Sequence, residues 1–174
     1  MAEALSDMLD AANVNLACFD VRGSTYAIEI GSVREIVRTT EITPLPNAPE
    51  LIEGIVDLRG MVIPVMDLSR SLGHGPGDRG SRARIVVLDL DGLILGLLVD
   101  AATDVLSIES TRLEDVPDLA AQAGYDVIRH VVRRSGEPPV MVLALETLVE
   151  RVYRSAIPGM SAAKSGLGPS EGSA

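Results

Sequence analysis

The sequence contains no Trp, a single Phe and three Tyr, so aromatic residues make up only 2% of its 174 residues. Few rings are therefore available to stack on nucleic-acid bases or to anchor an interface. Hydrophobic residues nevertheless reach 47%, so a core must be built from Val, Ile and Leu. Such residues favour β-strands, and this composition excludes disorder for most of the chain.

Cysteine is equally scarce. Cys18 is the only one, which excludes an internal disulfide and a zinc site made of several cysteines. A chain of this kind suits a reducing compartment, and we expect a cytoplasmic protein. Its acidic start differs from a secretory signal, and no apolar run approaches the roughly 18 residues needed to cross a bilayer. We therefore expect no direct membrane insertion.

Basic residues are outnumbered. The chain has 15 Lys and Arg against 25 Asp and Glu, a formal net charge of -10. This is the wrong sign for neutralising phosphates or anionic lipid head groups. Nucleic acid is therefore not an expected partner.

What the sequence does contain is a series of short apolar runs facing each other across Gly-containing turns, a pattern typical of β-hairpins. Four hairpins are predicted, over 16–30, 54–65, 85–99 and 127–145, with their turns at 22–23, 59–60, 91–92 and 135–136. Short helices are predicted over 48–53, 67–72 and 146–154. The fold class is therefore mainly β.

The hairpins form two similar pairs. Residues 20–37 align without a gap on 89–106, which places Gly23 on Gly92, and 51–60 aligns on 127–136, which places Gly60 on Gly136. A duplication of half the chain is the simplest account, although chance similarity between hairpins stays an alternative. Closing about five short strands into a barrel removes exposed edges.

We therefore expect two small five-stranded SH3-like β-barrels packed side by side along an apolar seam, with short helices at the connections and at the C-terminal end. The predicted domain covers 14–154, its barrels cover about 14–72 and 84–154, and a flexible loop over 73–83 joins them. Residues 1–13 and 155–174 have the composition of mobile ends.

Motifs for chemistry are weak. The G-x-G-x-x-G pattern over 75–80 is followed by a predicted strand, whereas a nucleotide fingerprint needs a helix there. His74 and His130 have no partners at metal-ligand spacing, and no activated nucleophile is apparent. We expect no catalytic, cofactor-binding or metal-binding residues.

The most unusual segment is the turn at Arg59 and Gly60, which is followed by a run of Met, Val and Ile. A charged tip over apolar surface is a mixture that interfaces favour, although a solvated turn Arg is the plainer alternative. Glu35 lies among hydrophobic neighbours and would be half-buried without a partner. We predict that Glu35 pairs with Arg59.

Several ordered motifs resemble the CheW-like chemotaxis coupling family, across about 14–150. They are YAIEI at 26–30, ITPLPNAP at 42–49, IEGIVDLRG at 52–60, IPVMDL at 63–68 and GLLVD at 96–100. The resemblance implies a pair of five-stranded barrels, in agreement with the duplication. It also implies a non-enzymatic adaptor of a two-component signal-transduction system, which joins the cytoplasmic tips of methyl-accepting chemoreceptors to the regulatory domain of a CheA-type histidine kinase.

Such an adaptor would be recruited to receptor arrays at the inner face of the membrane and could assemble into rings with itself or the kinase. A CheW-like scaffold of a non-flagellar system, such as pilus motility, or a small-ligand sensing module are the alternatives. The expected partner-binding residues are Glu35, Arg59 and Gly60 at the charged tip, and four aliphatic residues of a groove between the barrels, Val33, Ile36, Val99 and Val105.

The sequence departs from the family pattern at three positions. Asp57 stands where Asn is usual, His130 where Gly is usual and Ala144 where Asp is usual. Two of the three lie in the second half, which is therefore the less typical one.

Overall fold

The computed structural model describes residues 13–116 and 126–156. Of the ends expected to be mobile, it describes only Asn13, which begins the first strand, and residues 155–156, which end the last helix. The rest of the predicted ends, 1–12 and 157–174, lies outside the described residues.

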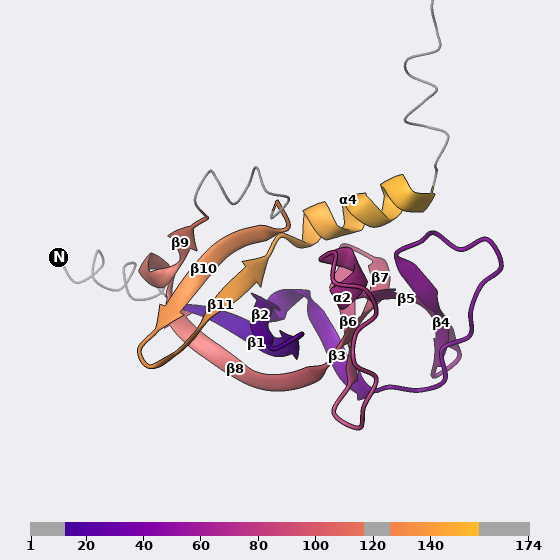
Figure 1. The fold of residues 1–174 in the computed structure, drawn as a ribbon, viewed down its shortest axis with the longest axis horizontal. Coiled ribbons are helices and arrows are strands. Elements are labelled where there is room, and N and C mark those ends of the chain that lie inside the picture. Colours follow the sequence, from indigo (N-terminus) through magenta and orange to yellow (C-terminus); the bar gives the residue numbers. More distant parts are fainter. Residues whose placement is uncertain (1–12, 117–125, 157–174) are drawn as a thin grey trace, which may run out of the picture.

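The described chain is mainly β and forms two sheets (Figure 1). Sheet A has the strand order β8-β1-β2-β11-β10-β9, and sheet B has the order β3-β6-β7-β5-β4. The strands of sheet A are β1 (Asn13–Val21), β2 (Ser24–Glu29), β8 (Ala101–Glu109), β9 (Glu114–Asp115), β10 (Ile128–Arg134) and β11 (Glu137–Leu143). Those of sheet B are β3 (Val33–Arg38), β4 (Ile52–Leu58), β5 (Met61–Asp67), β6 (Arg84–Leu90) and β7 (Leu93–Val99).

Two small SH3-like subdomains are thus confirmed, with the predicted five strands in sheet B and six in sheet A. The predicted assignment of residues 14–72 to one barrel and 84–154 to the other is wrong. The hairpin β1-β2 belongs to sheet A, where it pairs with β8 and β11 of the second half. The hairpin β6-β7 belongs to sheet B, where it pairs with β3 and β5 of the first half. Each half therefore gives its first hairpin to the other half, and neither ladder closes into a complete barrel among the described strands.

The duplication itself is visible in the register of the strand pairs. Ala17 pairs with Val105 between β1 and β8, and the matching pair between β6 and β3 is Val86 with Ile36. The parallel pairs agree too, since β11 joins β2 in sheet A as β5 joins β7 in sheet B. Equivalent strands thus occupy equivalent places in both sheets.

All four predicted hairpins are present. In three of their turns both central residues have positive φ, as a type I′ turn requires. Asp91 and Gly92 have φ of 52° and 93°, and Arg59 and Gly60 have 54° and 81°. Asp and Gly tolerate positive φ readily, whereas Arg59 adopts it because the two-residue turn between β4 and β5 requires it.

The hydrophobic core has three parts. One cluster lies within sheet A around Leu16 and Val140, and a second lies within sheet B around Ile63 and Ile85. The largest cluster forms the predicted apolar seam, because it joins residues of both sheets, such as Phe19 of β1 and Leu88 of β6. Burying this seam makes the two subdomains one unit.

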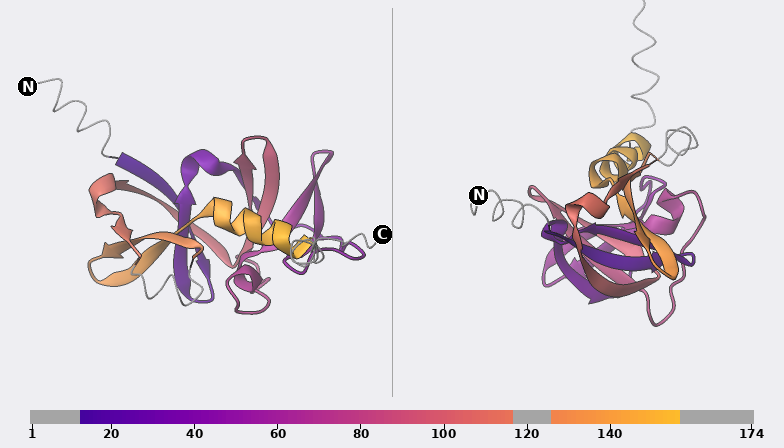
Figure 2. Two further views of the ribbon diagram at one scale, coloured as in Figure 1. Left: turned by 90° about the horizontal axis from the view of Figure 1, so that it is seen from above. Right: turned by 90° about the vertical axis from the view of Figure 1, so that its left-hand side faces the viewer.

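Two helices flank the sheets. The helix α2 (Leu68–Ser71) follows β5, and α4 (Leu145–Ala156) follows β11. Figures 1 and 2 show α4 leaving sheet A and running across toward sheet B. Leu148 of α4 packs into the seam, and Arg151 donates a hydrogen bond to the carbonyl of Ser71 at the end of α2. The helix predicted over 48–53 is absent, because the amide of Ile52 closes a turn onto the carbonyl of Pro49 and β4 begins there.

The predicted loop over 73–83 contains no helix or strand, and β6 follows it directly. The loop is fixed by hydrogen bonds to residues of both halves of the chain. The Arg22 guanidinium donates to the carbonyls of His74 and Pro76 at 2.7 Å, and Asp100 accepts from the amide of Asp78 at 2.9 Å. The buried carboxylate of Asp67 accepts from the amide of Gly77.

A candidate partner-binding tip on sheet B

The turn between β4 and β5 presents Arg59 to solvent. Its side chain is 79% exposed, and the turn beneath it is closed by the amide of Gly60, which donates to Asp57 Oδ1 at 2.8 Å. Asp57 therefore supplies the side-chain oxygen that the usual Asn would also offer. The backbone of the tip is fixed without help from the Arg59 side chain.

The predicted pair of Arg59 and Glu35 is confirmed. Arg59 Nη2 lies 3.1 Å from Glu35 Oε2, and the Glu35 side chain is only 24% exposed. Glu35 belongs to β3, which lies at the opposite end of the strand order from β4. The ion pair therefore joins the two ends of sheet B, which must curl to bring them together.

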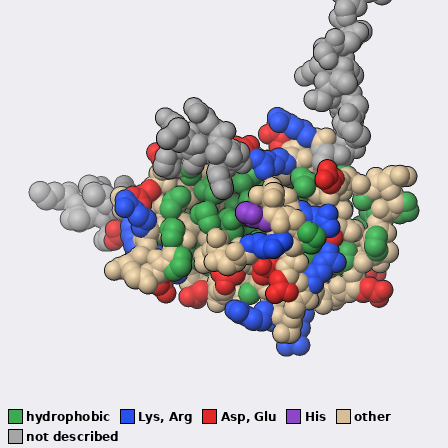
Figure 3. Space-filling view, in the orientation of Figure 1, with side chains coloured by type: hydrophobic (Ala, Val, Ile, Leu, Met, Phe, Trp, Pro, Cys, Tyr) green, Lys and Arg blue, Asp and Glu red, His purple; other side chains and the backbone are tan. Residues whose placement is uncertain are grey.

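Two exposed hydrophobic residues directly follow the turn that carries Arg59. Met61 and Val62, directly after the turn, are 41% and 60% exposed, while the next residues, Ile63 and Val65, point into the core of sheet B. Leu45, in the segment before β4, is also exposed. Hydrophobic side chains are visible on the surface at the right-hand end of Figure 3, where β4 and the preceding segment lie. We call Glu35, Arg59, Gly60, Met61 and Val62 the charged tip.

Among the described residues, sheet A has no equivalent of the charged tip. The residues that match Glu35 and Arg59 in the duplication are Asp104 and Ser135. Arg133 and Arg134 precede the matching turn, but they pair with Glu114 and Glu137. Asp104 instead accepts a hydrogen bond from the amide of Val105. A partner that requires this combination of charge and apolar surface can therefore distinguish one subdomain from the other.

The four residues predicted to line a groove differ in their exposure to solvent. Ile36 and Val105 occupy matched positions on the edge strands β3 and β8 and are 44% and 55% exposed. Val33 is half-buried against the seam. The assignment of Val99 to a groove is contradicted, because its side chain is 1% exposed and belongs to the seam cluster.

The two departures in the second half have local consequences. Asp67 caps α2 by accepting from the amide of Ser69, whereas Ala144, its match before α4, has no side-chain acceptor. His130 lies in β10, and its Nδ1 is 3.5 Å from Asp115 Oδ1 but makes no hydrogen bond within the described part of the chain. Neither residue lies in the charged tip.

Groups that could carry chemistry are few among the described residues. Burial raises the pKa of the Cys18 thiol, which lies in the core of sheet A and is therefore a poor nucleophile. No three His, Cys, Asp or Glu side chains in residues 13–116 and 126–156 are grouped so as to hold a metal ion. In the same residues no helix is long and apolar enough to cross a membrane.

The sequence pattern predicts Arg59, Gly60 and Glu35 as binding residues but not Met61 or Val62. Strand alternation could have found Val62, since Ile63 and Val65 are buried on the other face of β5 and Val62 must face away from it. The exposure of Met61 depends on its place directly after the turn.

Comparison with known proteins agrees with this architecture. A family model described as the CheW-like domain matches residues 15–152. The chemotaxis protein CheW of Rhizobium meliloti is 34% identical over 121 residues, covering 70% of this chain and 78% of the relative. CheW of Bacillus subtilis is 29% identical over 141 residues, covering 80% and 90%. The crystal structure of the scaffolding protein TtCheW from Thermoanaerobacter tengcongensis superposes with a TM-score of 0.69 at 29% identity, covering 78% of this chain and 86% of that one.

Proposed function

Because this chain belongs to the CheW-like domain family, we propose that it joins the cytoplasmic tips of methyl-accepting chemoreceptors to the regulatory domain of a CheA-type histidine kinase. The chain is a chemotaxis adaptor, as its relatives named CheW and a solved scaffolding protein indicate. It acts by binding and not by catalysis.

The charged tip is the observation that carries the kinase part of the proposal. Arg59 is 79% exposed beside the exposed side chains of Met61 and Val62. Interfaces are enriched in Arg and Met, and their strongest contacts centre on such anchors. We therefore assign the tip to the regulatory domain of the kinase, whose barrel would pack against this outer part of sheet B.

The edge strands β3 and β8 support the receptor part. Ile36 and Val105 present aliphatic side chains to solvent at matched positions of the two sheets. A receptor tip is helical, and an amphipathic helix binds where aliphatic side chains accept its apolar face. Ile36, Val105 and the half-buried Val33 are the residues we assign to it.

The proposed partners determine where in the cell the chain would act. An adaptor that holds receptor tips works in the cytoplasm, at the inner face of the membrane, within receptor arrays. In a ring with the kinase or with further copies of the chain, the charged tip and the edge strands β3 and β8 would be occupied at the same time.

The test separates the two partners. The variants Ile36→Asp and Val105→Asp are compared with the unchanged chain in pull-downs with a receptor-tip fragment and with a kinase regulatory domain. Loss of receptor binding with kinase binding kept supports the assignment of the edge strands. Unchanged binding of both partners by folded variants contradicts it, with folding checked by circular dichroism.

A further inference from the structure

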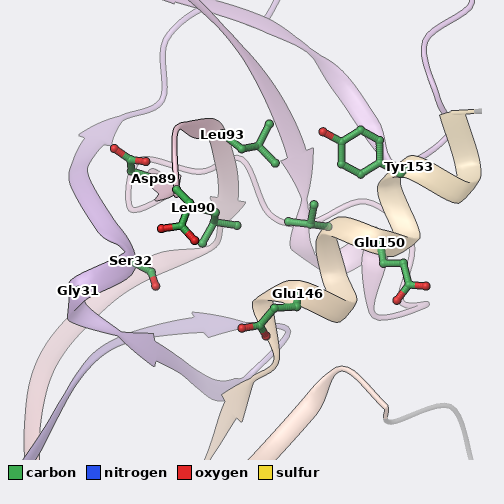
Figure 4. A pocket seen from close by; sticks show the side chains of 10 residues that line it. Gly31, Ser32, Asp89, Leu90, Leu93, Glu146, Glu150 and Tyr153 are labelled. Atoms are coloured by element: carbon green, nitrogen blue, oxygen red, sulfur yellow. The ribbon is translucent and has the colours of Figure 1, made fainter.

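A cleft of about 600 Å³ lies between α4 and the turn that joins β6 to β7, and no residue of the charged tip lines it. The short 3-10 helix η1 (Ile30–Ser32) contributes Gly31 and Ser32 at one end (Figure 4). The volume is in the range of clefts that bind ligands, about 300–1,000 Å³. Nothing in the adaptor role proposed above uses this surface.

One wall of the cleft is a single stripe of α4. Glu146, Val149, Glu150 and Tyr153 line it, and their spacing of three, four and seven residues places them on one face of a helix. Leu145 and Leu148 of α4 are buried in the seam, and Val152 packs partly buried against it. One face of α4 is therefore fixed by the seam, and the other face is accessible in the cleft.

The opposite wall is the β6-β7 turn, with Asp89, Leu90, Asp91 and Leu93. The turn is fixed, because Asp89 Oδ1 accepts a hydrogen bond from the amide of Gly92 at 2.9 Å. Figure 4 shows the Tyr153 ring and the Leu93 side chain facing each other across the cleft. Both walls thus combine aliphatic or aromatic surface with two carboxylates.

The charge of the cleft is one-sided. Four carboxylates line it and no Lys or Arg does. Glu146 pairs with Arg129 at 2.9 Å and Glu150 with Arg154 at 2.5 Å, but all four side chains are at least half exposed, so these pairs are weak and exchangeable. Asp91 has no ion-pair or hydrogen-bond partner among the described residues, and its side chain is free to meet a cation.

We propose that this cleft binds a basic amphipathic segment of a partner protein, with an Arg or Lys side chain between the two acidic walls and a neighbouring aliphatic side chain on Leu90, Leu93 and Val149. A bare metal ion fits less well, because the carboxylates stand on opposite walls with apolar side chains between them, and no three acidic, His or Cys side chains of the described residues converge. The four carboxylates of the lining disfavour an anionic ligand. A cation flanked by aliphatic surface satisfies both features of the cleft.

The probe is a synthetic 14-residue helical peptide of Arg, Leu and Ala, with Arg and Leu on one face. Its two controls replace each Arg by Glu or each Leu by Ser. Binding to the full chain is measured by fluorescence anisotropy of labelled peptide in 0.1 M salt, and the site by amide shifts in nitrogen-15 NMR spectra. We expect the Arg-Leu peptide to bind and to shift residues of α4 and of the β6-β7 turn, and both control peptides to bind at least about tenfold more weakly.

The matched protein variants remove the same charge at two places. Asp91→Asn with Glu150→Gln neutralises one carboxylate on each wall, and Asn tolerates the positive φ of position 91. Glu41→Gln with Glu50→Gln removes two exposed carboxylates elsewhere. We expect about tenfold weaker binding for the first variant, from two lost charge contacts, and a change within twofold for the second.

Three results would overturn the proposal: equal binding of the Arg and Glu peptides, equal weakening by both double variants, or amide shifts confined to other surfaces. Because none of these variants touches Arg59, Ile36 or Val105, this proposal and the adaptor proposal fail independently.

Discussion

Replacing Arg59 by Ala separates the stability of the charged tip from its binding. The turn is held by the hydrogen bond from the Gly60 amide to Asp57, and both Arg and Ala meet the same strain at a φ of 54°. The lost interaction is therefore the ion pair with Glu35. With the Arg59 side chain 79% exposed, that pair contributes about 0 to 1 kcal/mol to the free energy of unfolding.

Binding should change far more. Truncating an Arg at the centre of an interface commonly costs about 2 kcal/mol or more, which is a loss of about thirtyfold in affinity. We therefore expect Arg59→Ala to unfold in urea within about 1 kcal/mol of the unchanged chain. In titration calorimetry its affinity for the kinase regulatory domain should fall by about thirtyfold or more.

The matched control is Arg82→Ala, which removes an exposed Arg from the loop over 73–83. It should change neither stability nor kinase binding. Kinase binding by Arg59→Ala equal to that of the unchanged chain would remove Arg59 from the interface, as would an equal loss of binding with Arg82→Ala. A stability loss well above 1 kcal/mol for Arg59→Ala would show instead that the tip has a structural role.

Three further predictions concern the fold. Val99→Asp places a charge in the seam and should lower the free energy of unfolding in urea by more than about 4 kcal/mol. Val105→Asp, at an exposed position of an edge strand, should lower it by about 1 kcal/mol or less, and similar losses for both variants would contradict the burial of Val99. Gly54→Ala, at a φ of 155°, puts a Cβ against the backbone oxygen of Thr43 and should lower the free energy of unfolding in urea by at least about 2 kcal/mol; an unchanged free energy would contradict this close approach. The Arg133 side chain lowers the pKa of Glu114, so Arg133→Gln should raise that pKa in a carbon-13 NMR titration, and an unchanged pKa would disprove the pairing. In the unchanged chain the small stabilisation from this pair is present at neutral pH and is lost as the pH falls through the lowered pKa.

Hairpins were predictable because their signals are local. The turns at Arg59-Gly60 and Asp91-Gly92 need positive φ, and the flanking residues alternate or run apolar, so the sequence alone indicates both strands and the turn. The duplication was also visible, since matched Gly residues mark matched turns.

The exchange of hairpins between the halves could not be predicted in the same way. Strand partners far apart in the sequence depend on which apolar faces meet in three dimensions, and Val86 of β6 can satisfy its hydrogen bonds against β3 or a similar edge strand equally well. Because the two halves have similar sequences, each offers suitable partners for both hairpins. Only the fold shows which partner is used.

The same distinction applies to the candidate site. Glu35 and Arg59 could be paired from the sequence because a half-buried acid needs a cation. Val99 could not be distinguished from Val105 by residue type, since burial depends on position in the sheet: Val105 is on an edge strand and Val99 ends a central one.

In the proposed function, one chain holds a receptor tip and a kinase at the same time through separate surfaces. The most direct measurement mixes the full chain with a helical receptor-tip fragment and a CheA-type regulatory domain, and determines the mass of the complex by light scattering during size-exclusion chromatography. We expect a three-component complex that loses only the kinase domain with Arg59→Ala and only the receptor fragment with Ile36→Asp. Competition between the two partners for the chain, so that no three-component complex forms, would contradict it.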